Sequence, residues 1–298
     1  MGSNITRREA VLGIAASAGA LVAAGTAGAV IESHVHLFDP ARVPYSPDAP
    51  YKPAAYTLED HLRLVAAAGL AHSVIVHPEP YQDDHRYLEY CLAHEPSPGY
   101  FKGTCMFDPL REDTPGRMRA LAERWPKRIV ALRIHEMSMA YEANGPIRQR
   151  DMTDPRMTAC WQAVAAMGMA VQMHFIPGQA RAIHELAARF SGTTVILDHM
   201  GRPGQGTEEE YAEVLKLATL PRVILKYSGW DYYKGDMSQL TKRLYDTFGP
   251  ERMMWGMLGN TPADYQKQAA RFEELLAFTP ESDRAKIRGG NARRLFFS

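Results

Sequence analysis

The sequence predicts a single α/β domain with the fold of a parallel (β/α)8 barrel, and two observations lead to this fold class. After residue 29, eight short apolar or β-branched runs alternate with segments that carry apolar residues every three or four positions. This alternation fills about 270 residues without an internal linker, a length that one barrel domain commonly has. Because doubly wound proteins show the same alternation, an open sheet stays the alternative fold.

The strand–helix alternation can be followed along the whole chain. Leu58, Leu62 and Val65 have the helical spacing that marks the segments between strands as crossover helices. A proline-rich stretch, 44–53, is predicted to be a long loop after the first strand. The predicted strands are 30–37, 73–77, 102–107, 129–134, 170–175, 194–197, 223–227 and 252–256.

Composition and charge narrow the classes of function. Hydrophobic residues make up 46% and charged residues 23% of the chain, the balance of a globular protein with a sizeable core. Lys plus Arg equals Asp plus Glu at 34 each, so no global field favours nucleic acid or an anionic membrane surface. The predicted partner is a small molecule. We interpret Cys91, Cys105 and Cys160 as buried apolar residues, with one disulfide as the alternative, because they form no CxxC pair.

The first 29 residues have the layout of an export signal. Arg7 and Arg8 stand directly before an Ala- and Gly-rich apolar stretch that carries no charge after Glu9. Adjacent arginines before a weakly hydrophobic stretch resemble a twin-arginine signal, and Ala27 and Ala29 offer an A-x-A cleavage site. A buried first helix or a membrane anchor is the alternative, but an anchor needs roughly 20 strongly apolar residues. We therefore expect signal 1–29, barrel 30–298, and a periplasmic or secreted protein without membrane contact.

Four histidines stand where predicted strands end, and active sites of barrels lie at that end. His34 and His36 are two residues apart, so the period of two along a strand points both to the same side. Two such imidazoles can chelate one divalent cation. His174 and His199 end two further strands, and together the four predict a functional site. Other histidines are interpreted as ordinary surface residues: His61, His72, His85, His94 and His184.

Further polar side chains are predicted at the same end. Arg133 ends its strand, where a guanidinium suits bidentate capture of a carboxylate, although it can pair with Glu79 or Asp198 instead. His135 shares its face two residues later. The expected rim residues after the second and seventh strands are Glu79, Tyr81, Lys226, Ser228, Trp230 and Asp231.

With these residues in place, the chain after residue 29 resembles the amidohydrolase-related family of metal-dependent barrel hydrolases. Members of that family include sugar lactonases, the pyrone-dicarboxylate lactonase and several non-oxidative decarboxylases. The loop 44–51 is similar to that of the lactonase branch. The segments that carry the resemblance are Ile31-Glu32-Ser33-His34-Val35-His36-Leu37-Phe38-Asp39-Pro40, Arg133, His174, Asp198-His199-Met200-Gly201-Arg202-Pro203, Leu225-Lys226-Tyr227-Ser228-Gly229, Met254-Trp255-Gly256 and Gly290-Asn291-Ala292-Arg293-Arg294-Leu295-Phe296.

The resemblance implies roles for these residues. His34, His36 and His174 would be ligands of a divalent metal, Zn or Mn, although some lactonase members need none. His199 would polarise the substrate or orient water, and Arg133 would hold a substrate carboxylate. Together with rim position, the resemblance nominates as further substrate contacts Tyr45, Tyr81, His135, Arg202 and Ser228.

The chain departs from the family after the last predicted strand. The family carries Trp-Gly-Ser/Thr-Asp there, and that aspartate binds metal and takes a proton from the attacking water. Leu258 occupies the place of the aspartate in this chain and can do neither. General-base catalysis contributes typically about 10²–10⁴-fold, so hydrolysis would need another group. Asn260 can orient a water, and the candidate carboxylates are Glu79, Glu32, Asp231 and Asp264.

Three functions follow as hypotheses. The first is a hydrolase that opens a small carboxylated lactone or cyclic ester, with Arg133 on the carboxylate. The second is a lyase that decarboxylates an aromatic or unsaturated acid. The third is a degenerate barrel that binds a ligand without turnover, which Leu258 favours. Oligomerisation stays open.

Overall fold

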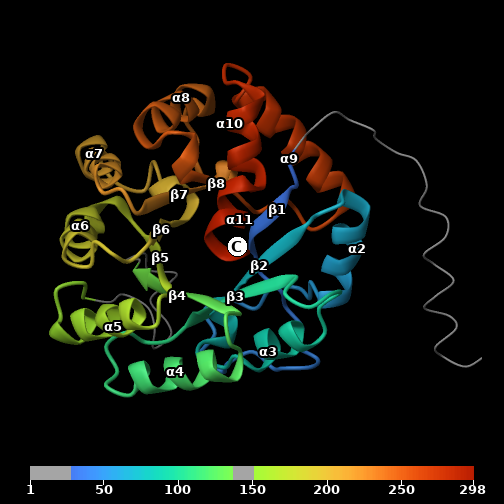
Figure 1. Ribbon diagram of the computed structural model, residues 1–298, viewed down its shortest axis with the longest axis vertical. Coiled ribbons are helices and arrows are strands. Elements are labelled where there is room, and N and C mark those ends of the chain that lie inside the picture. Colours follow the sequence, from blue (N-terminus) through green and yellow to red (C-terminus); the bar gives the residue numbers. More distant parts are fainter. Residues whose placement is uncertain (1–27, 137–150) are drawn as a thin grey trace, which may run out of the picture.

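Eight parallel strands form the centre of the protein and follow one another around it in chain order (Figure 1). The computed structural model describes residues 28–136 and 151–298. Each predicted strand overlaps an observed one, so this part of the sequence prediction is confirmed. The strands are β1 Ile31–Val35, β2 His72–Val76, β3 Phe101–Met106, β4 Ile129–Glu136, β5 Ala170–Phe175, β6 Val195–Leu197, β7 Val223–Tyr227 and β8 Met253–Trp255.

The sheet curls round so that its first and last strands lie side by side. Ser33 Oγ donates a hydrogen bond to the Trp255 carbonyl at 2.5 Å, and the Met257 N–H donates to the His34 carbonyl at 3.3 Å. Neighbouring strands are consecutive in sequence throughout. A doubly wound sheet would reverse the strand order at one point, so the open-sheet alternative is wrong.

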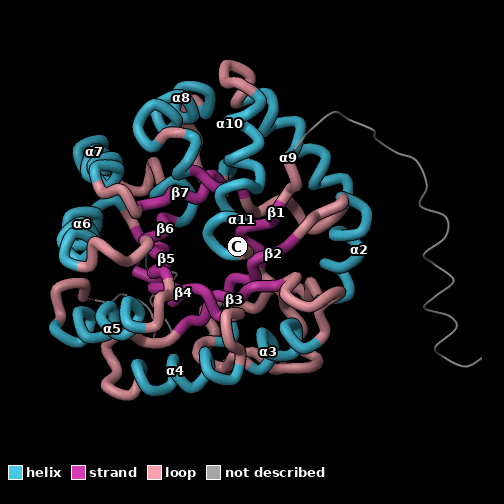
Figure 2. Tube along the Cα trace, in the orientation of Figure 1, coloured by secondary structure: helices cyan, strands magenta, loops and turns pink. Residues whose placement is uncertain are grey.

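Helices surround the strands as an outer ring (Figure 2). Two of them, α2 and α7, begin with capping boxes, Thr57 with Asp60 and Thr207 with Glu210, which satisfy N–H groups of their first turns. None of the helices in the described ranges is long and apolar enough to cross a membrane. The helices are α2 Leu58–Ala68, α3 Arg86–Ala93, α4 Thr114–Arg124, α5 Pro155–Ala166, α6 Ala180–Arg189, α7 Glu208–Lys216, α8 Met237–Phe248, α9 Pro262–Leu275, α10 Glu281–Ala285 and α11 Asn291–Phe296.

The short helix α11 closes one end of the barrel, and Figure 1 shows it at the centre of the ring of strands. Its Ala292 and Phe296 pack against one apolar layer contributed by seven strands. The layer consists of Ile31, Val74, Ala131, Ala170, Ile196, Ile224 and Met254. Each of these residues lies at or before the midpoint of its strand, so the opposite end, where the strands finish, is the one left for a site.

Other sequence predictions have mixed outcomes. Residues 1–27 lie outside the described part of the chain, so the export signal stays a prediction. The three cysteines are buried and free, as interpreted. The surface assignment is wrong for His61 and His85, which are buried, and His72 begins β2. The spacing of apolar residues did not show which side chains of these segments face the core.

Candidate active site

A pair of histidines stands at the end of β1. Ile31 and His34 both reach the barrel interior although they are three residues apart, because the register of β1 against β2 shifts between Glu32 and Val35. His34 Nε2 lies 3.2 Å from His36 Nε2. His36 Nδ1 lies 2.7 Å from the Val76 carbonyl, a contact that requires the proton on Nδ1 and leaves Nε2 with its lone pair.

The spacing of the two nitrogens fits a shared divalent cation. Nitrogens bound at about 2.0–2.1 Å to one tetrahedral ion lie roughly 3.3–3.4 Å apart. Burial, followed by the charge of Lys226, holds the pKa of His34 well below its usual value. Burial, followed by the charge of Arg133, lowers the pKa of His36 to about 3. Both rings are therefore neutral at physiological pH, the state in which imidazole binds a metal.

A layer of charged and amide side chains lies directly above the apolar layer. Each member comes two residues after an apolar one on the same strand: Arg133 on β4, Gln172 on β5, Asp198 after β6 and Lys226 on β7. The Asp198 carboxylate accepts hydrogen bonds from Gln172 Nε2 at 2.9 and 3.1 Å and from Arg133 Nε at 3.3 Å. Asp198 Oδ1 also lies 3.5 Å from His34 Nδ1 and 3.9 Å from Lys226 Nζ.

This layer tunes the charge state of its members. Burial alone would raise the pKa of Asp198, but His34, Lys226 and Arg133 hold it well below its usual value, so the carboxylate is ionised. Burial lowers the pKa of Lys226 to about 8, against the opposing charge of Asp198. Asp198 therefore orients His34 as outer-shell carboxylates orient metal-binding histidines. His34, Asp198 and His199 each offer one possible donor atom, and these three atoms all lie within 4.8 Å of one another.

His174 lies between two arginines. Arg133 Nη2 is 2.9 Å from His174 Nδ1, and Arg202 Nη1 is 2.6 Å from His174 Nε2. A guanidinium only donates, and a neutral imidazole accepts at one nitrogen alone, so the ring cannot accept from both arginines at once. His174 can bind a metal through Nε2 only if Arg202 moves. Arg133 and Arg202 instead form a cationic clamp on the two ring nitrogens of His174. A bound anion would loosen these two contacts.

His199 and Arg202 are presented by a left-handed turn after β6. His199, Met200, Gly201 and Arg202 have φ values of 49°, 59°, 69° and 60°. For residues other than glycine this conformation costs roughly 1–2 kcal/mol each. Glycine is required at position 201 for two reasons. Its φ is positive, and a Cβ there would overlap Cγ1 of Val214. Such strain is concentrated at functional sites, and here it turns both polar side chains toward the mouth.

The loop after β7 completes the surroundings of His199. Ser228 was expected at the rim but is buried, and its Oγ lies 3.1 Å from His199 Nδ1. Burial lowers the pKa of His199 to about 3, with Asp198 opposing, so its ring is neutral. The ring centroid lies 4.7 Å from that of His34 and 5.3 Å from that of His174. Of the four predicted histidines, His34 and His174 thus both lie beside His199, and His36 contacts His34.

The polar residues after β2 are buried and do not lie at the rim of the barrel. Glu79 Oε1 lies 3.1 Å from His135 Nδ1, and both side chains are buried. The Tyr81 hydroxyl accepts the Asp39 N–H at 2.7 Å, and the Tyr45 hydroxyl donates to the Pro53 carbonyl at 3.0 Å. The ring centroids of Tyr45 and Tyr81 lie 5.2 Å apart. Their hydroxyl groups therefore hold the loop after β1 in place.

Leu258 is fully buried beside the histidine pair, where it borders a cavity of about 370 Å³ together with His34, His36 and Asn260. The Glu32 carboxylate accepts the N–H groups of Met257 and Leu258 at 2.9 and 2.7 Å, which fixes the loop after β8. Burial raises the pKa of Glu32 to about 7, against these hydrogen bonds. Asn260, which is exposed, and Asp264, which is half-buried, also line the cavity, and Asp231 instead pairs with Arg271 at 2.8 Å.

Sequence analysis missed the central layer, although a signal for it was present. Lys226 was expected at the rim, but it is wholly buried and contacts His34 Nδ1 at 3.4 Å. No role was predicted for Gln172. Both side chains come two residues after an apolar residue of a predicted strand, which is the signal for the layer. The pairing of Arg133 with Asp198 is the alternative that the sequence had left open, and the structure bears it out.

Comparison with known proteins agrees with the fold. The model of the family described as amidohydrolase matches residues 31–297. The chain belongs to the amidohydrolase family. Over 285 residues it is 26% identical to the 4-sulfomuconolactone hydrolase of Hydrogenophaga intermedia, with 89% of this chain and 88% of the relative covered. It is 24% identical to the L-fucono-1,5-lactonase of Burkholderia ambifaria, with 88% and 93% covered.

Among solved structures, the fold is similar to a probable 2-pyrone-4,6-dicarboxylic acid hydrolase from Acinetobacter baumannii that holds citric acid. The TM-score is 0.74 at 18% identity, and the match covers 90% of this chain and 99% of the other. At this identity the likeness shows the barrel fold. The family placement rests on the family model, and it confirms the resemblance on which the sequence prediction was based.

Proposed function

We propose that this protein hydrolyses a small lactone that carries at least one anionic group. The observation that carries the proposal is the clamp of Arg133 and Arg202 on His174, next to the His34–His36 pair. The clamp suits a carboxylate or sulfonate, because guanidinium groups recognise oxyanions through paired hydrogen bonds. The relatives named as a sulfomuconolactone hydrolase and a fuconolactonase act on lactones, which supports this bond type.

Charge in the site favours an anionic substrate. Arg133, Arg202 and Lys226 bring three cationic groups to the centre of the barrel, and the acid that lies against two of them is Asp198. An anion bound beside these cations would lower the cost of burying them and would release His174 from its double contact.

The reaction in this proposal adds one water across the ring ester. The water oxygen forms a bond to the carbonyl carbon, the bond from that carbon to the ring oxygen breaks, and the water proton ends on the released hydroxyl. His199, neutral and held at Nδ1 by Ser228, orients the water through its other nitrogen. Asp198 keeps His34 in the tautomer whose Nε2 faces His36.

The histidine pair fits a divalent metal in spacing and in charge state, so we include Zn²⁺ or Mn²⁺ in the proposal. His34 and His36 would hold it through their Nε2 atoms, with His199 as the further donor. Such an ion supplies Lewis-acid polarisation of the carbonyl and a lower pKa for water. It would also reduce the need for the acid that Leu258 replaces.

The test combines metal analysis with a panel of lactones that carry carboxylate or sulfonate groups. We expect about one equivalent of metal per chain, base consumption in a pH-stat, and one water gained by the product. His36→Ala should lose the metal and lower kcat/KM by at least roughly 10³-fold. The control His94→Ala changes an exposed histidine and should alter neither.

Two outcomes would overturn the proposal. Release of CO₂ without gain of water would establish a decarboxylase. Tight binding of an anionic lactone without turnover, together with activity that appears only in Leu258→Asp, would establish a ligand-binding barrel.

Export through the twin-arginine pathway is a separate proposal, and Arg7→Lys with Arg8→Lys should retain the unprocessed chain inside cells.

A further inference from the structure

We propose that Tyr232 is a stacking surface that selects planar, conjugated ring acids over saturated ones at the mouth of the barrel. The inference rests on the proposed function, because it names the class of anionic lactone that the arginine clamp would accept. It begins from the exposure of this side chain. Tyr232 is 49% exposed, whereas Trp230, two residues earlier in the same turn, is 3% exposed.

The turn that carries Tyr232 is firmly anchored. Trp230 stacks on Trp255 with ring centroids 6.4 Å apart and an interplanar angle of 10°. Arg271 pairs with Asp231 at 2.8 Å and places its guanidinium carbon 5.5 Å from the Trp230 ring. The exposed tyrosine is therefore a fixed feature of the mouth and not the tip of a loose loop.

Tyr232 lies against two residues of the site. Its ring centroid is 5.6 Å from that of His199, at an interplanar angle of 76°. The guanidinium carbon of Arg202 lies over its face, 5.4 Å from the ring centroid. Gly229 makes this approach possible, since a Cβ there would lie 2.8 Å from Tyr232 Cδ2 and 3.0 Å from His199 Nδ1. The close fit of ring, histidine and glycine indicates that the face of Tyr232 belongs to the site.

Geometry connects this stacking to the shape of the substrate. A carboxylate paired in bidentate fashion with a guanidinium lies in the guanidinium plane. In a conjugated ring acid the ring shares the plane of its carboxylate, so an acid held by Arg202 parallel to the Tyr232 ring would place its own ring over the face on which the guanidinium lies. A saturated ring is puckered out of that plane and loses the contact. Aromatic and cation–π contacts of this kind are worth up to roughly tenfold in affinity.

The experiment compares two dicarboxylates of equal charge and similar spacing, benzene-1,3-dicarboxylate and cis-cyclohexane-1,3-dicarboxylate, by isothermal titration calorimetry on the full chain. Wild type should bind the planar acid about tenfold more tightly. Tyr232→Ala should reduce the ratio to within about twofold, and Tyr232→Phe should keep it, because the ring and not the hydroxyl stacks. Phe278→Ala, which removes an aromatic that is also 49% exposed but lies after α9, should keep it as well.

The outcomes separate this inference from the proposed function, because binding is measured without turnover. Equal affinity of wild type for the two acids, no binding of either, or a ratio unchanged in Tyr232→Ala would overturn the inference. Thermal unfolding of each variant shows whether it is folded, and Tyr232→Leu repeats the test if the alanine variant is not. A normal ratio in a protein that hydrolyses no lactone would instead count against the proposed function alone.

Discussion

The two ends of the barrel are built from opposite materials. At the end closed by α11, the strands contribute Ile31, Ala170, Ile224 and others to one apolar layer. Two residues further along several of those strands, the interior holds a guanidinium, a primary amide, a carboxylate and an ammonium group. The first end offers apolar packing that stabilises the fold, whereas the second combines buried charge with a strained left-handed turn.

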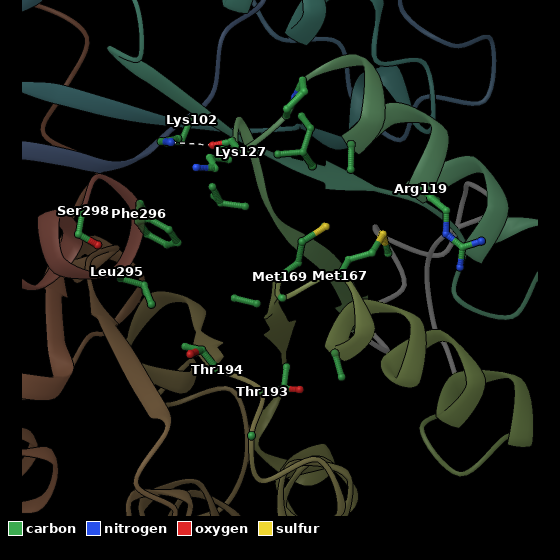
Figure 3. Close-up of a pocket in the computed structure, with 18 of the residues that line it drawn as sticks. Lys102, Arg119, Lys127, Met167, Met169, Thr193, Thr194, Leu295, Phe296 and Ser298 are labelled. Carbon is green, nitrogen blue, oxygen red and sulfur yellow. Dashed lines mark hydrogen bonds between the residues drawn. The ribbon is translucent and has the colours of Figure 1, made fainter.

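The size of a cavity does not show which end of the barrel holds the candidate site. A cavity of about 890 Å³ lies at the α11 end, between Lys102, Met169 and Phe296 (Figure 3). Its described lining holds no histidine, and Lys102 Nζ already donates to the Lys127 carbonyl at 2.6 Å. The cavity beside His34 is less than half as large, at about 370 Å³. Chemistry follows the side chains that converge, here the histidines, and not the volume that is open.

The largest effect should follow from neutralising the charged layer. Asp198→Asn keeps the shape but leaves Arg133 and Lys226 without their negative partner and frees His34 to turn. We expect kcat/KM for an anionic lactone to fall about 10³-fold, roughly 4 kcal/mol. Initial rates in a pH-stat measure this. The matched control is Asp246→Asn, an exposed partner of Lys242, which should stay within twofold. A fall of less than tenfold for Asp198→Asn would show that the layer is not needed for activity.

The next effect should be confined to stability. Phe296→Ala removes a ring that plugs the apolar end, at a cost of about 3 kcal/mol in the free energy of unfolding. Urea titration measures the loss, and Phe278→Ala, an exposed aromatic, should cost under about 0.5 kcal/mol. Folded Phe296→Ala protein should keep kcat/KM within twofold. A tenfold loss of kcat/KM would break the comparison, because it would show that the two ends are coupled.

The sequence was sufficient for the barrel and for the four strand-end histidines, because strand period and helical spacing are local properties. It was insufficient for the network among them. The double contact of His174 depends on Arg133 and Arg202, which are 41 and 28 residues away in the chain. The bulge in β1 that brings His34 inward depends on β2. Periodicity assigns a side chain to a face, but only the closed barrel decides which faces meet.

The smallest effect concerns a histidine that shares burial with the site but not its function. His61 packs between α2 and β2, with Nε2 2.9 Å from Ser73 Oγ and Nδ1 3.3 Å from the Tyr56 hydroxyl. Burial lowers the pKa of His61 to about 4. Between pH 6.5 and pH 4 the unfolded chain therefore binds a proton that the folded chain refuses, so stability falls as the pH falls.

His61 should thus account for about 2 kcal/mol of the stability lost between pH 7 and pH 5. His61→Gln keeps a polar group near Ser73 and cannot be protonated, so its stability should decline less over that range, as urea titrations at both pH values would show. The variant should retain its kcat/KM at pH 7, in contrast to His36→Ala. Parallel pH profiles for wild type and His61→Gln would mean that His61 binds its proton equally in the folded and unfolded chain, and the acid sensitivity would then belong to the histidines of the site.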